Sequence, residues 1–365
     1  MFYSPIIKLG EAETRAVKSL TDDVARLLSP VIEITRGRGV TIKKDGARYT
    51  EYPHDKRLRT VLTKFKYCDK IFLDVTNSPE LSNEIINELF DPEDGYKKWI
   101  QYVDRLMKEF GCNIIPSILL NFDDIDFESN FIKQVQELTQ TYKGVFYRCN
   151  VEDVGSVDDL SIIKSYIGNC HLFLLIDCGY IQQAQEKEYL NAVDLRIVEF
   201  KKILKGVSVS YIVSGTSFPD NISEIGLDNY DYFSLAEVKL CDDIQSLGHD
   251  VIYSDYGLIA IKRNDRVIMT RGWVPRIDVP TGTDFYYYRK RRDKVLGYGA
   301  SYVAVAKKVI EDRKFPKGYN DNWGIQQIKK TANGELAGAS PSFWISVRMN
   351  IHLQQQIDRI INPLL

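Results

Sequence analysis

Short apolar runs recur along the first 260 residues, and most of them end in one polar or charged side chain. Such short apolar runs are typical of strands that are buried on both faces, as in parallel sheets. The eight runs span residues 6–9, 31–34, 71–75, 114–120, 145–148, 172–177, 209–214 and 251–255. Because segments with helical periodicity separate them, we predict an α/β fold, namely a TIM-like (β/α)8 barrel.

The segments between the runs predict helices. Residues 11–28 place six apolar side chains on one side of a helix, and turn or helix-start signals flank the later segments. We predict those later helices at 55–66, 79–90, 93–110, 127–141, 157–167, 182–204 and 235–247. This alternation predicts parallel strands with right-handed crossovers. A doubly wound open sheet is the competing fold, but eight strands with charged ends on nearly all of them favour the closed barrel.

Residues 36–53 interrupt this pattern with a polar, glycine-rich stretch that begins Arg36-Gly37-Arg38-Gly39. Asp45-Gly46 lies between two short strand-like segments, so we predict a β-hairpin there. An insertion after the second strand belongs to the active face of a barrel, where lids are usually found.

The alternation stops after residue 260. We expect strands at 266–270 and 342–347, an aromatic and then basic segment at 284–292, a helix at 298–312, loop and helix within 315–336, and a closing helix at 350–365. We therefore divide the chain into a barrel at 1–260 and a C-terminal α+β elaboration at 261–365. The elaboration either completes or caps the barrel, or forms a small appended domain.

Composition narrows the class of protein only a little. The chain has 365 residues, 44% hydrophobic content, 27% charged content and a formal net charge of -2. This charge provides no overall attraction for nucleic acid or acidic membranes. The sequence has neither a spanning apolar segment nor a signal peptide, so we expect a cytoplasmic protein. Six widely spaced cysteines lack the spacing of a zinc or redox site, which indicates reduced thiols.

Charged side chains stand at the carboxyl ends of six predicted strands. They are Lys8, Glu33, Asp74, Arg148, Asp177 and Asp255. A lone charge in such a position requires a partner, because burying an unpaired ion costs several kcal/mol or more. In a barrel all six converge on one mouth, so we take them as candidate catalytic residues.

Three interpretations of this cluster remain open. In the first, Glu33, Asp74 and Asp177 hold Mg²⁺ or Mn²⁺, Asp255 orients the site, and Lys8 and Arg148 clamp a phosphate or carboxylate for metal-assisted phosphoester hydrolysis. In the second, Lys8 has a lowered pKa and acts as a base or Schiff-base nucleophile, with the carboxylates carrying protons. In the third, the charges pair with one another and seal the mouth without catalysis.

Weaker signals point to phosphate or nucleic-acid binding. Arg289, Arg291 and Arg292 follow three tyrosines, whose rings could stack on bases while the cations meet phosphates. Arg36 and Arg38 could grip a phosphate near the mouth. The plainer interpretations are a solvated strand end and a flexible loop. His352 is a candidate acid–base group if the last helix covers the mouth, although a lone helical histidine is more often structural.

Several short motifs, taken in order, give the chain a resemblance to a known family. They are Pro5-Ile6-Ile7-Lys8 with Gly10-Glu11, Ser29-Pro30-Val31-Ile32-Glu33-Ile34, Leu73-Asp74-Val75, Leu175-Ile176-Asp177, Ser217-Phe218-Pro219, Ser254-Asp255-Tyr256-Gly257, Trp323-Gly324, Ser342-Phe343-Trp344 and Asn350-Ile351-His352-Leu353. Over nearly its whole length the chain resembles the Beta-protein family, which takes its name from a bacteriophage protein and is found widely in bacteria. One departure is Ile325, which stands where the family has an aspartate.

The resemblance implies an accessory or mobile-element protein with a role in phage–host conflict, and it brings no assigned reaction. Our leading hypothesis is a cytoplasmic barrel enzyme with a site for an anion such as a phosphate or nucleotide at the strand ends. The alternative is a non-catalytic interaction module that binds nucleic acid or a companion nuclease through its basic C-terminal segment.

Overall fold

The computed structural model describes residues 3–44, 46–219, 229–262 and 272–362. All eight predicted strands are present, and they form two parallel four-stranded sheets. The first sheet has the order β1 (Ile6–Lys8), β2 (Val31–Ile34), β5 (Ile71–Val75), β6 (Ile114–Pro116). The second has the order β11 (Val251–Asp255), β9 (Val209–Thr216), β8 (His171–Tyr180), β7 (Gly144–Asn150). The fold is therefore mixed α/β with parallel sheets, as the alternation predicts.

Single parallel bridges link the outer strands of the two sheets. Ser117, just after β6, bridges to Phe146 of β7, and Tyr3, just before β1, bridges to Tyr253 of β11. Backbone hydrogen bonds accompany both bridges: the Ile118 amide donates to the Phe146 carbonyl at 2.7 Å, and the Ser4 amide donates to the Tyr253 carbonyl at 3.0 Å. The two sheets thus meet along both edges.

An inner apolar cluster lies between the sheets. It consists of Ile6, Val31, Phe72, Ile115, Phe146, Phe173, Leu175, Ile212 and Tyr256, with Ile252 packed against it. Every one of the eight parallel strands supplies a residue to this set, counting Ile252 for β11. The strands are therefore buried on this side as well as on the side that their helices cover, which explains why the runs are almost continuously apolar.

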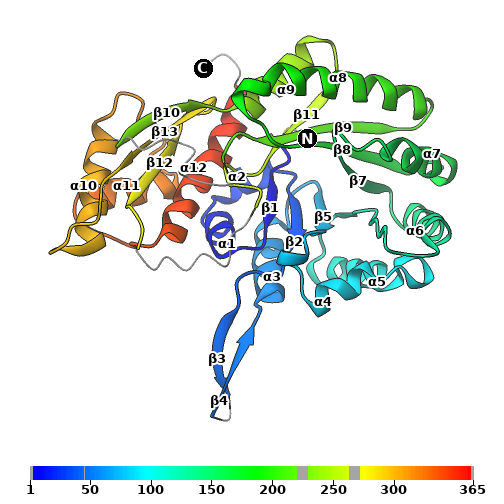
Figure 1. The fold of residues 1–365 in the computed structure, drawn as a ribbon, viewed down its shortest axis with the longest axis horizontal. Helices are drawn as coiled ribbons and strands as arrows, with labels where there is room; N and C mark the ends of the chain where they lie inside the picture. The colour runs from blue at the N-terminus through cyan, green and yellow to red at the C-terminus, as the bar shows by residue number, and fades with distance from the viewer. Residues whose placement is uncertain (1–2, 45, 220–228, 263–271, 363–365) are drawn as a thin grey trace.

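Helices separate the strands and pack outside them (Figure 1). They are α1 (Glu11–Lys18), α2 (Asp22–Arg26), α3 (His54–Phe65), α4 (Glu84–Asn87), α5 (Glu93–Phe110), α6 (Phe127–Thr141), α7 (Ser156–Tyr166), α8 (Glu186–Ile203) and α9 (Ala236–Ser246), with 3-10 turns at Pro79–Leu81, Glu88–Phe90 and Gln183–Gln185. In α5 the apolar side chains recur at helical spacing, so Trp99, Ile100, Val103 and Leu106 are buried. The predicted helix at 11–28 is instead two short helices.

The predicted hairpin is present as β3 (Val40–Lys44) and β4 (Ala47–Glu51), which pair antiparallel. It projects away from the rest of the molecule, toward the bottom of Figure 1. Gly46 has a φ of 79°, a left-handed conformation that glycine adopts without strain, which explains its place in the turn.

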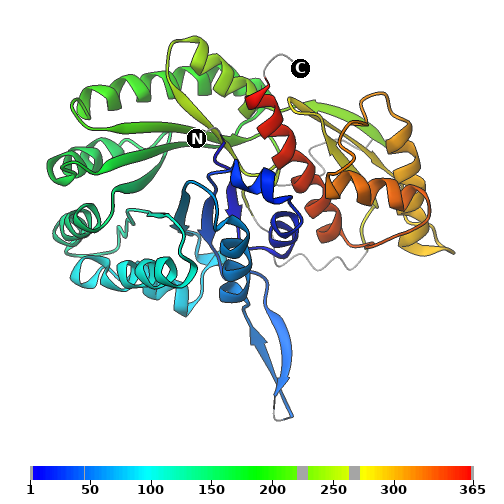
Figure 2. The same ribbon diagram turned by 180° about the vertical axis from the view of Figure 1, so that it is seen from behind.

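A three-stranded antiparallel sheet lies beside the two parallel sheets. Its order is β10 (Tyr230–Ser234), β13 (Asp284–Arg289), β12 (Arg276–Pro280). The helices α10 (Gly297–Glu311), α11 (Trp323–Ala332) and α12 (Pro341–Ile361) belong to the same part of the chain. Figures 1 and 2 show α12 between this sheet and the parallel strands. Since β10 precedes α9 in sequence, residues before 260 contribute to this sheet.

Two expectations for the C-terminal part need comment. The predicted strand at 342–347 is wrong, because these residues form the first turns of α12. Two features begin this helix: the N-cap Ser340 accepts a hydrogen bond from the Phe343 amide, and Pro341 is the first helical residue. The predicted strand at 266–270 lies outside the described residues. Among the described residues, no helix is both long enough and apolar enough to span a membrane.

Candidate functional site

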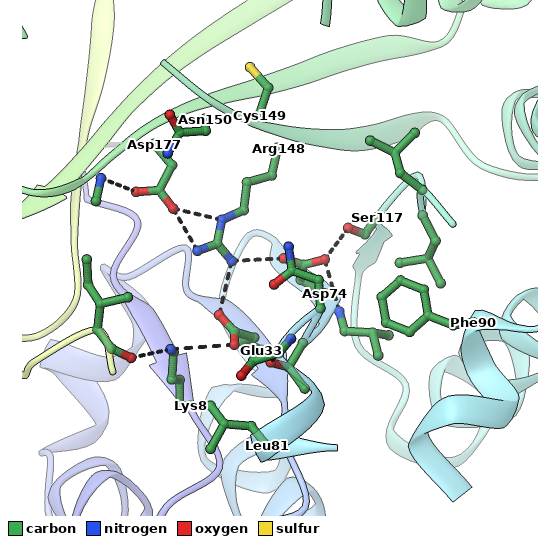
Figure 3. A pocket seen from close by; sticks show the side chains of 18 of the residues that line it. Lys8, Glu33, Asp74, Leu81, Phe90, Ser117, Arg148, Cys149, Asn150 and Asp177 are labelled. Atoms are coloured by element: carbon green, nitrogen blue, oxygen red, sulfur yellow. Dashed lines mark hydrogen bonds and ion pairs between the residues drawn. The ribbon is translucent and has the colours of Figure 1, made fainter. Parts of the chain in front are cut away.

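Five of the six predicted strand-end residues meet at the carboxyl ends of the parallel strands (Figure 3). Lys8, Glu33 and Asp74 are register partners on β1, β2 and β5, so they stand side by side at one level of the first sheet. Arg148 and Asp177 come from β7 and β8 of the second sheet. The two sheets therefore present their charges to each other across the mouth.

The Arg148 guanidinium lies at the centre of this cluster. Its Nε and Nη2 donate to Asp177 Oδ2 at 3.1 and 2.7 Å, and Nη2 also donates to the Tyr256 hydroxyl at 2.8 Å. Its Nη1 donates to Glu33 Oε2 at 3.0 Å and to Asp74 Oδ2 at 3.1 Å. An arginine has five N–H donors, so these contacts engage all of them. Arg148 therefore positions three carboxylates and has no donor left for a ligand.

Asp74 and Glu33 have opposite pKa shifts, although both accept from the same Arg148 nitrogen. Burial raises the pKa of Asp74, and Arg148 together with the Ser117 hydroxyl, which donates at 2.6 Å, offsets only part of this effect. Burial would also raise the pKa of Glu33, but Lys8 and Arg148 outweigh it and hold that pKa below its ordinary value. The pair thus combines a carboxyl group that retains its proton more readily with one that is more readily ionised.

Lys8 and Tyr256 complete the wall of the site. The Lys8 ammonium donates to the Ile261 carbonyl at 2.8 Å, lies 3.7 Å from Glu33 Oε1 and faces the Tyr256 ring at 5.7 Å. The Tyr256 hydroxyl donates to Asp177 Oδ2 at 2.5 Å. Lys8 is thus a hydrogen-bonded cation at the rim of the cluster.

These residues open into a cavity of about 360 Å³. Polar and apolar residues at the strand ends and in the segments that follow them complete its lining, among them Asn77, Ser78, Leu81, Phe90 and Asn150. This volume is within the range of small-molecule sites in proteins.

Asp255 does not belong to this cavity, contrary to the expectation that it shares the mouth. It is fully buried and accepts hydrogen bonds from the Tyr3 and Tyr253 hydroxyls and the Gly257 amide, each at 2.7 Å. Its fourth partner is His352 Nε2 of α12, also at 2.7 Å. Burial would raise the pKa of Asp255, but His352 and the two tyrosines outweigh it and lower that pKa. Asp255 and His352 therefore link β11 to α12 and do not face a ligand.

The three carboxylates assigned to Mg²⁺ or Mn²⁺ do not fit a metal in this arrangement. Arg148 lies between Glu33, Asp74 and Asp177 and donates to each of them. In the described part of the chain, no group of three or more His, Cys, Asp or Glu side chains is arranged to hold a metal ion. The guanidinium takes the place that a divalent cation would need.

The other cations predicted to bind phosphate lie outside the cavity. Arg36 donates to the carbonyl oxygens of Glu80 and Gly37, and Arg38 is exposed at the base of the hairpin. Arg289 ends β13, and Arg291 and Arg292 are exposed beyond it. The neighbouring Tyr286 and Tyr287 are fully buried, so their rings cannot stack on bases.

Two residues of the site escaped the sequence interpretation. Ser117, the partner of Asp74, directly follows β6, and Tyr256, the partner of Arg148 and Asp177, directly follows β11. Tyr256 directly follows the predicted run 251–255, so a strand-end rule that included hydroxyl groups would have found it. Ser117 lies inside the predicted run 114–120, and only the early end of β6 at Pro116 places it at a strand end.

Comparison with known proteins agrees with the resemblance seen in the short motifs. The chain is similar to Protein beta of Enterobacteria phage P4, with 25% identity over 370 residues that cover 98% of this chain and 93% of the phage protein. The family model described as Beta protein matches residues 3–358. Because that match covers nearly the whole sequence, the chain belongs to the Beta protein family.

Proposed function

We propose that the eight parallel strands act as one closed (β/α)8 barrel with its working face at the carboxyl ends. Two observations support this arrangement: the bridges along both edges of the sheets, and the inner apolar cluster to which every parallel strand contributes a residue. Working groups of such barrels gather at the carboxyl ends of the strands, where Lys8, Glu33 and Asp74 stand in register.

We propose further that the protein is an enzyme that performs acid–base chemistry on a small anionic molecule in the mouth cavity. The observation that carries this proposal is the pair Glu33 and Asp74, which share one Arg148 nitrogen and have pKa values shifted in opposite directions. Neighbouring carboxyl groups with separated pKa values are suited to act as base and acid in one reaction. Asp74 would supply a proton and Glu33 would accept one.

Lys8 is the cation that we assign to the ligand. Its ammonium has three N–H donors, and among the described residues one of them is used, by the Ile261 carbonyl. The ammonium faces the cavity beside Glu33. Its role as a hydrogen-bonded cation favours anion binding over Schiff-base chemistry. A cavity of about 360 Å³ has room for a molecule the size of a sugar phosphate or nucleotide.

The reaction that this arrangement serves best is hydrolysis of a phosphoester without a metal at the carboxylates. Glu33 takes a proton from a water molecule whose oxygen forms a bond to phosphorus. The bond between phosphorus and the leaving oxygen breaks, and Asp74 gives its proton to that oxygen. Arg148 keeps both carboxyl groups in place. We place this activity in an accessory or phage–host conflict system, a role that the similarity to a phage protein supports.

The test is release of phosphate from a panel of small phosphomonoesters and phosphodiesters. We expect turnover by the wild-type chain and a 10²- to 10⁴-fold loss in Asp74→Asn and Glu33→Gln. The matched control is Asp159→Asn, because Asp159 is also buried and bonded to a hydroxyl, that of Tyr147 at 2.7 Å, but does not line the cavity. Equal turnover in all four proteins, or none in the wild type, would contradict the proposal.

The second candidate is the interaction module, and the exposure of Arg291 and Arg292 favours it. Replacing Arg289, Arg291 and Arg292 with alanine would abolish binding of nucleic acid or of a companion nuclease if this candidate is right, and would leave phosphate release unchanged if the enzyme proposal is right.

A further inference from the structure

The β3–β4 hairpin is a two-stranded ribbon, and no strand or helix of the described residues runs alongside it (Figures 1 and 2). Every residue of β4 is exposed, and in β3 only the middle residue is partly covered. An isolated two-stranded hairpin is at best marginally stable in water. A partner that covers this ribbon would therefore stabilise it.

One face of the ribbon concentrates positive charge. Lys43 lies directly opposite Arg48, and Thr41 lies directly opposite Thr50 two positions away on the same face. Like charges directly opposite each other destabilise a strand pair. Neither Lys43 nor Arg48 forms an ion pair with a described residue, so no described side chain relieves this repulsion.

The base of the ribbon is fixed beside the mouth cavity. The Arg36 amide donates to the Leu81 carbonyl at 2.8 Å, and the Arg36 guanidinium donates to the Glu80 carbonyl at 3.0 Å. The Arg36 guanidinium also lies 5.0 Å from the centre of the Tyr52 ring at the other end of the hairpin. Glu80 and Leu81 line the cavity, so the ribbon projects from the rim of the proposed active site.

We propose that this hairpin enters the major groove of double-stranded DNA, with Lys43 and Arg48 contacting phosphates. A ribbon of five residues per strand extends about 17 Å at roughly 3.4 Å per residue. The B-form major groove is about 12 Å wide and about 8.5 Å deep, and it admits a two-stranded ribbon. The ribbon is thus slender enough to enter the groove, and Lys43 and Arg48, which stand one pair before the ends of the strands at the turn, would lie within it and extend their side chains to the phosphates along its walls.

Charge complementarity selects this partner. Residues 36–52 contain five arginines and lysines against two acidic residues, whereas the whole chain has a net charge of -2. A-form RNA is a poorer fit, because its major groove is too narrow to admit side chains for readout. The inference is separate from the reaction proposed for the mouth, since none of the ribbon residues lines the cavity.

The experiment measures binding of the full chain to a fluorescent 24-base-pair duplex between about 50 and about 200 mM salt. We expect the Lys43→Ala/Arg48→Ala variant to bind at least tenfold more weakly, and the slope of log affinity against log salt to fall by about 2, because each phosphate contact contributes about 0.9. The control is Lys307→Ala/Lys308→Ala, which removes the same charge from exposed positions on α10.

A second variant separates binding from folding. Lys43→Glu places opposite charges across the ribbon, so the melting temperature should be unchanged or higher while duplex binding is lost. The proposal is overturned if the wild type does not bind the duplex at about 50 mM salt, or if the control weakens binding as much as the hairpin variant does. It is also overturned if only Arg289→Ala/Arg291→Ala/Arg292→Ala abolishes binding, or if the hairpin variant loses binding to anionic lipid vesicles but not to DNA.

Discussion

At the scale of single residues, Arg148 determines whether the mouth cluster can exist. Its guanidinium separates three carboxylates whose side chains are 5–11% exposed. Breaking a buried charge cluster by removing one partner typically costs 3–5 kcal/mol, because the remaining charges are left uncompensated. The cation therefore stabilises and also positions the two carboxylates of the proposed acid–base pair.

We predict that Arg148→Met lowers the free energy of unfolding by about 3 kcal/mol at pH 7, the lower end of that range because Arg148 is itself 21% exposed. The loss should shrink as the pH falls toward 4, since protonation removes the repulsion among the carboxylates. Urea unfolding at the two pH values measures this. A loss that is equal at both would show that the cost is one of packing and not of charge.

Glu237 provides a second residue-scale prediction, on pH. It is buried on α9, and its Oε2 accepts from the Ser217 amide at 2.8 Å. Its Oε1 has no hydrogen-bond partner among the residues that the structure describes. Burial raises its pKa to about 7. A folded pKa above the unfolded value means that this group stabilises the fold below about pH 4.5 and that the contribution is lost as the pH rises through 7.

We therefore expect Glu237→Gln to resist alkaline pH better than the wild type. The variant should be more stable by about 3 kcal/mol at pH 8.5, which corresponds to the size of the pKa shift, with a much smaller difference at pH 5. Chemical unfolding of both proteins at the two pH values provides the comparison. Parallel pH profiles would mean that Glu237 is not the titrating group.

At the scale of elements, Asp255 joins β11 to α12, and this structural role distinguishes it from the carboxylates that line the cavity. Asp255 and His352 are both fully buried and bonded to each other. From sequence, Asp255 is indistinguishable from Asp74 and Asp177, because all three are the last or the next-to-last residue of an apolar run. What differs is the direction of the side chain, which depends on Tyr3 and His352, residues distant in the chain.

We predict that Asp255→Asn destabilises the protein by about 3 kcal/mol, because His352 and two tyrosines lose a charged acceptor. The folded fraction should keep its affinity for a phosphoester ligand, since Asp255 does not line the cavity. Thermal unfolding and ligand titration below the melting temperature measure the two properties. Loss of affinity without loss of stability would contradict this prediction and would show that Asp255 takes part in ligand binding.

Element prediction succeeded where local pattern and tertiary packing agree. The eight strands and most of the helices before residue 260 follow from apolar runs and helical periodicity. The prediction for residues 342–347 was wrong, because the apolar run Phe343, Trp344 and Ile345 resembles a strand. The N-cap Ser340 and Pro341 instead begin a helix. Strands β10 and β12 were not predicted. β10 pairs with β13 from far away in the chain, a contact that local pattern does not reveal, whereas β12 forms a hairpin with β13 across residues 281–283, a local signal that the search for apolar runs did not include.

At the scale of the whole molecule, α12 joins two apolar cores. Met349, Leu353 and Ile357 pack in the large core with the parallel strands, whereas Trp344, Val347 and Ile351 pack in the core of the C-terminal sheet. Asn350 also donates to the Ala16 carbonyl of α1 at 3.0 Å. Sequence predicted both parts and a closing helix but not this shared role, because one helix with two apolar faces has no distinct periodic signature.

We expect the two parts to unfold together. A chain truncated to residues 1–260 would lack α12, leaving α1 and the Asp255 side chain uncovered, and would also leave β10 without β13. Such a chain should bind a dye specific for exposed apolar surface and lose its near-ultraviolet circular dichroism. A truncated chain with a sharp thermal transition and native spectra would establish that the boundary at 260 separates independent domains.

The most direct test of the central claim is the thermal shift of the protein with a panel of small phosphoesters. A ligand that binds only the folded state raises the melting temperature, by several degrees at a concentration about 100 times its dissociation constant. We predict such a rise for the wild type, its loss in Lys8→Met, and its retention in Lys307→Met, which alters an exposed lysine of α10. A panel that leaves the wild type unshifted, or a shift that survives in Lys8→Met, would contradict an anion site at the strand ends.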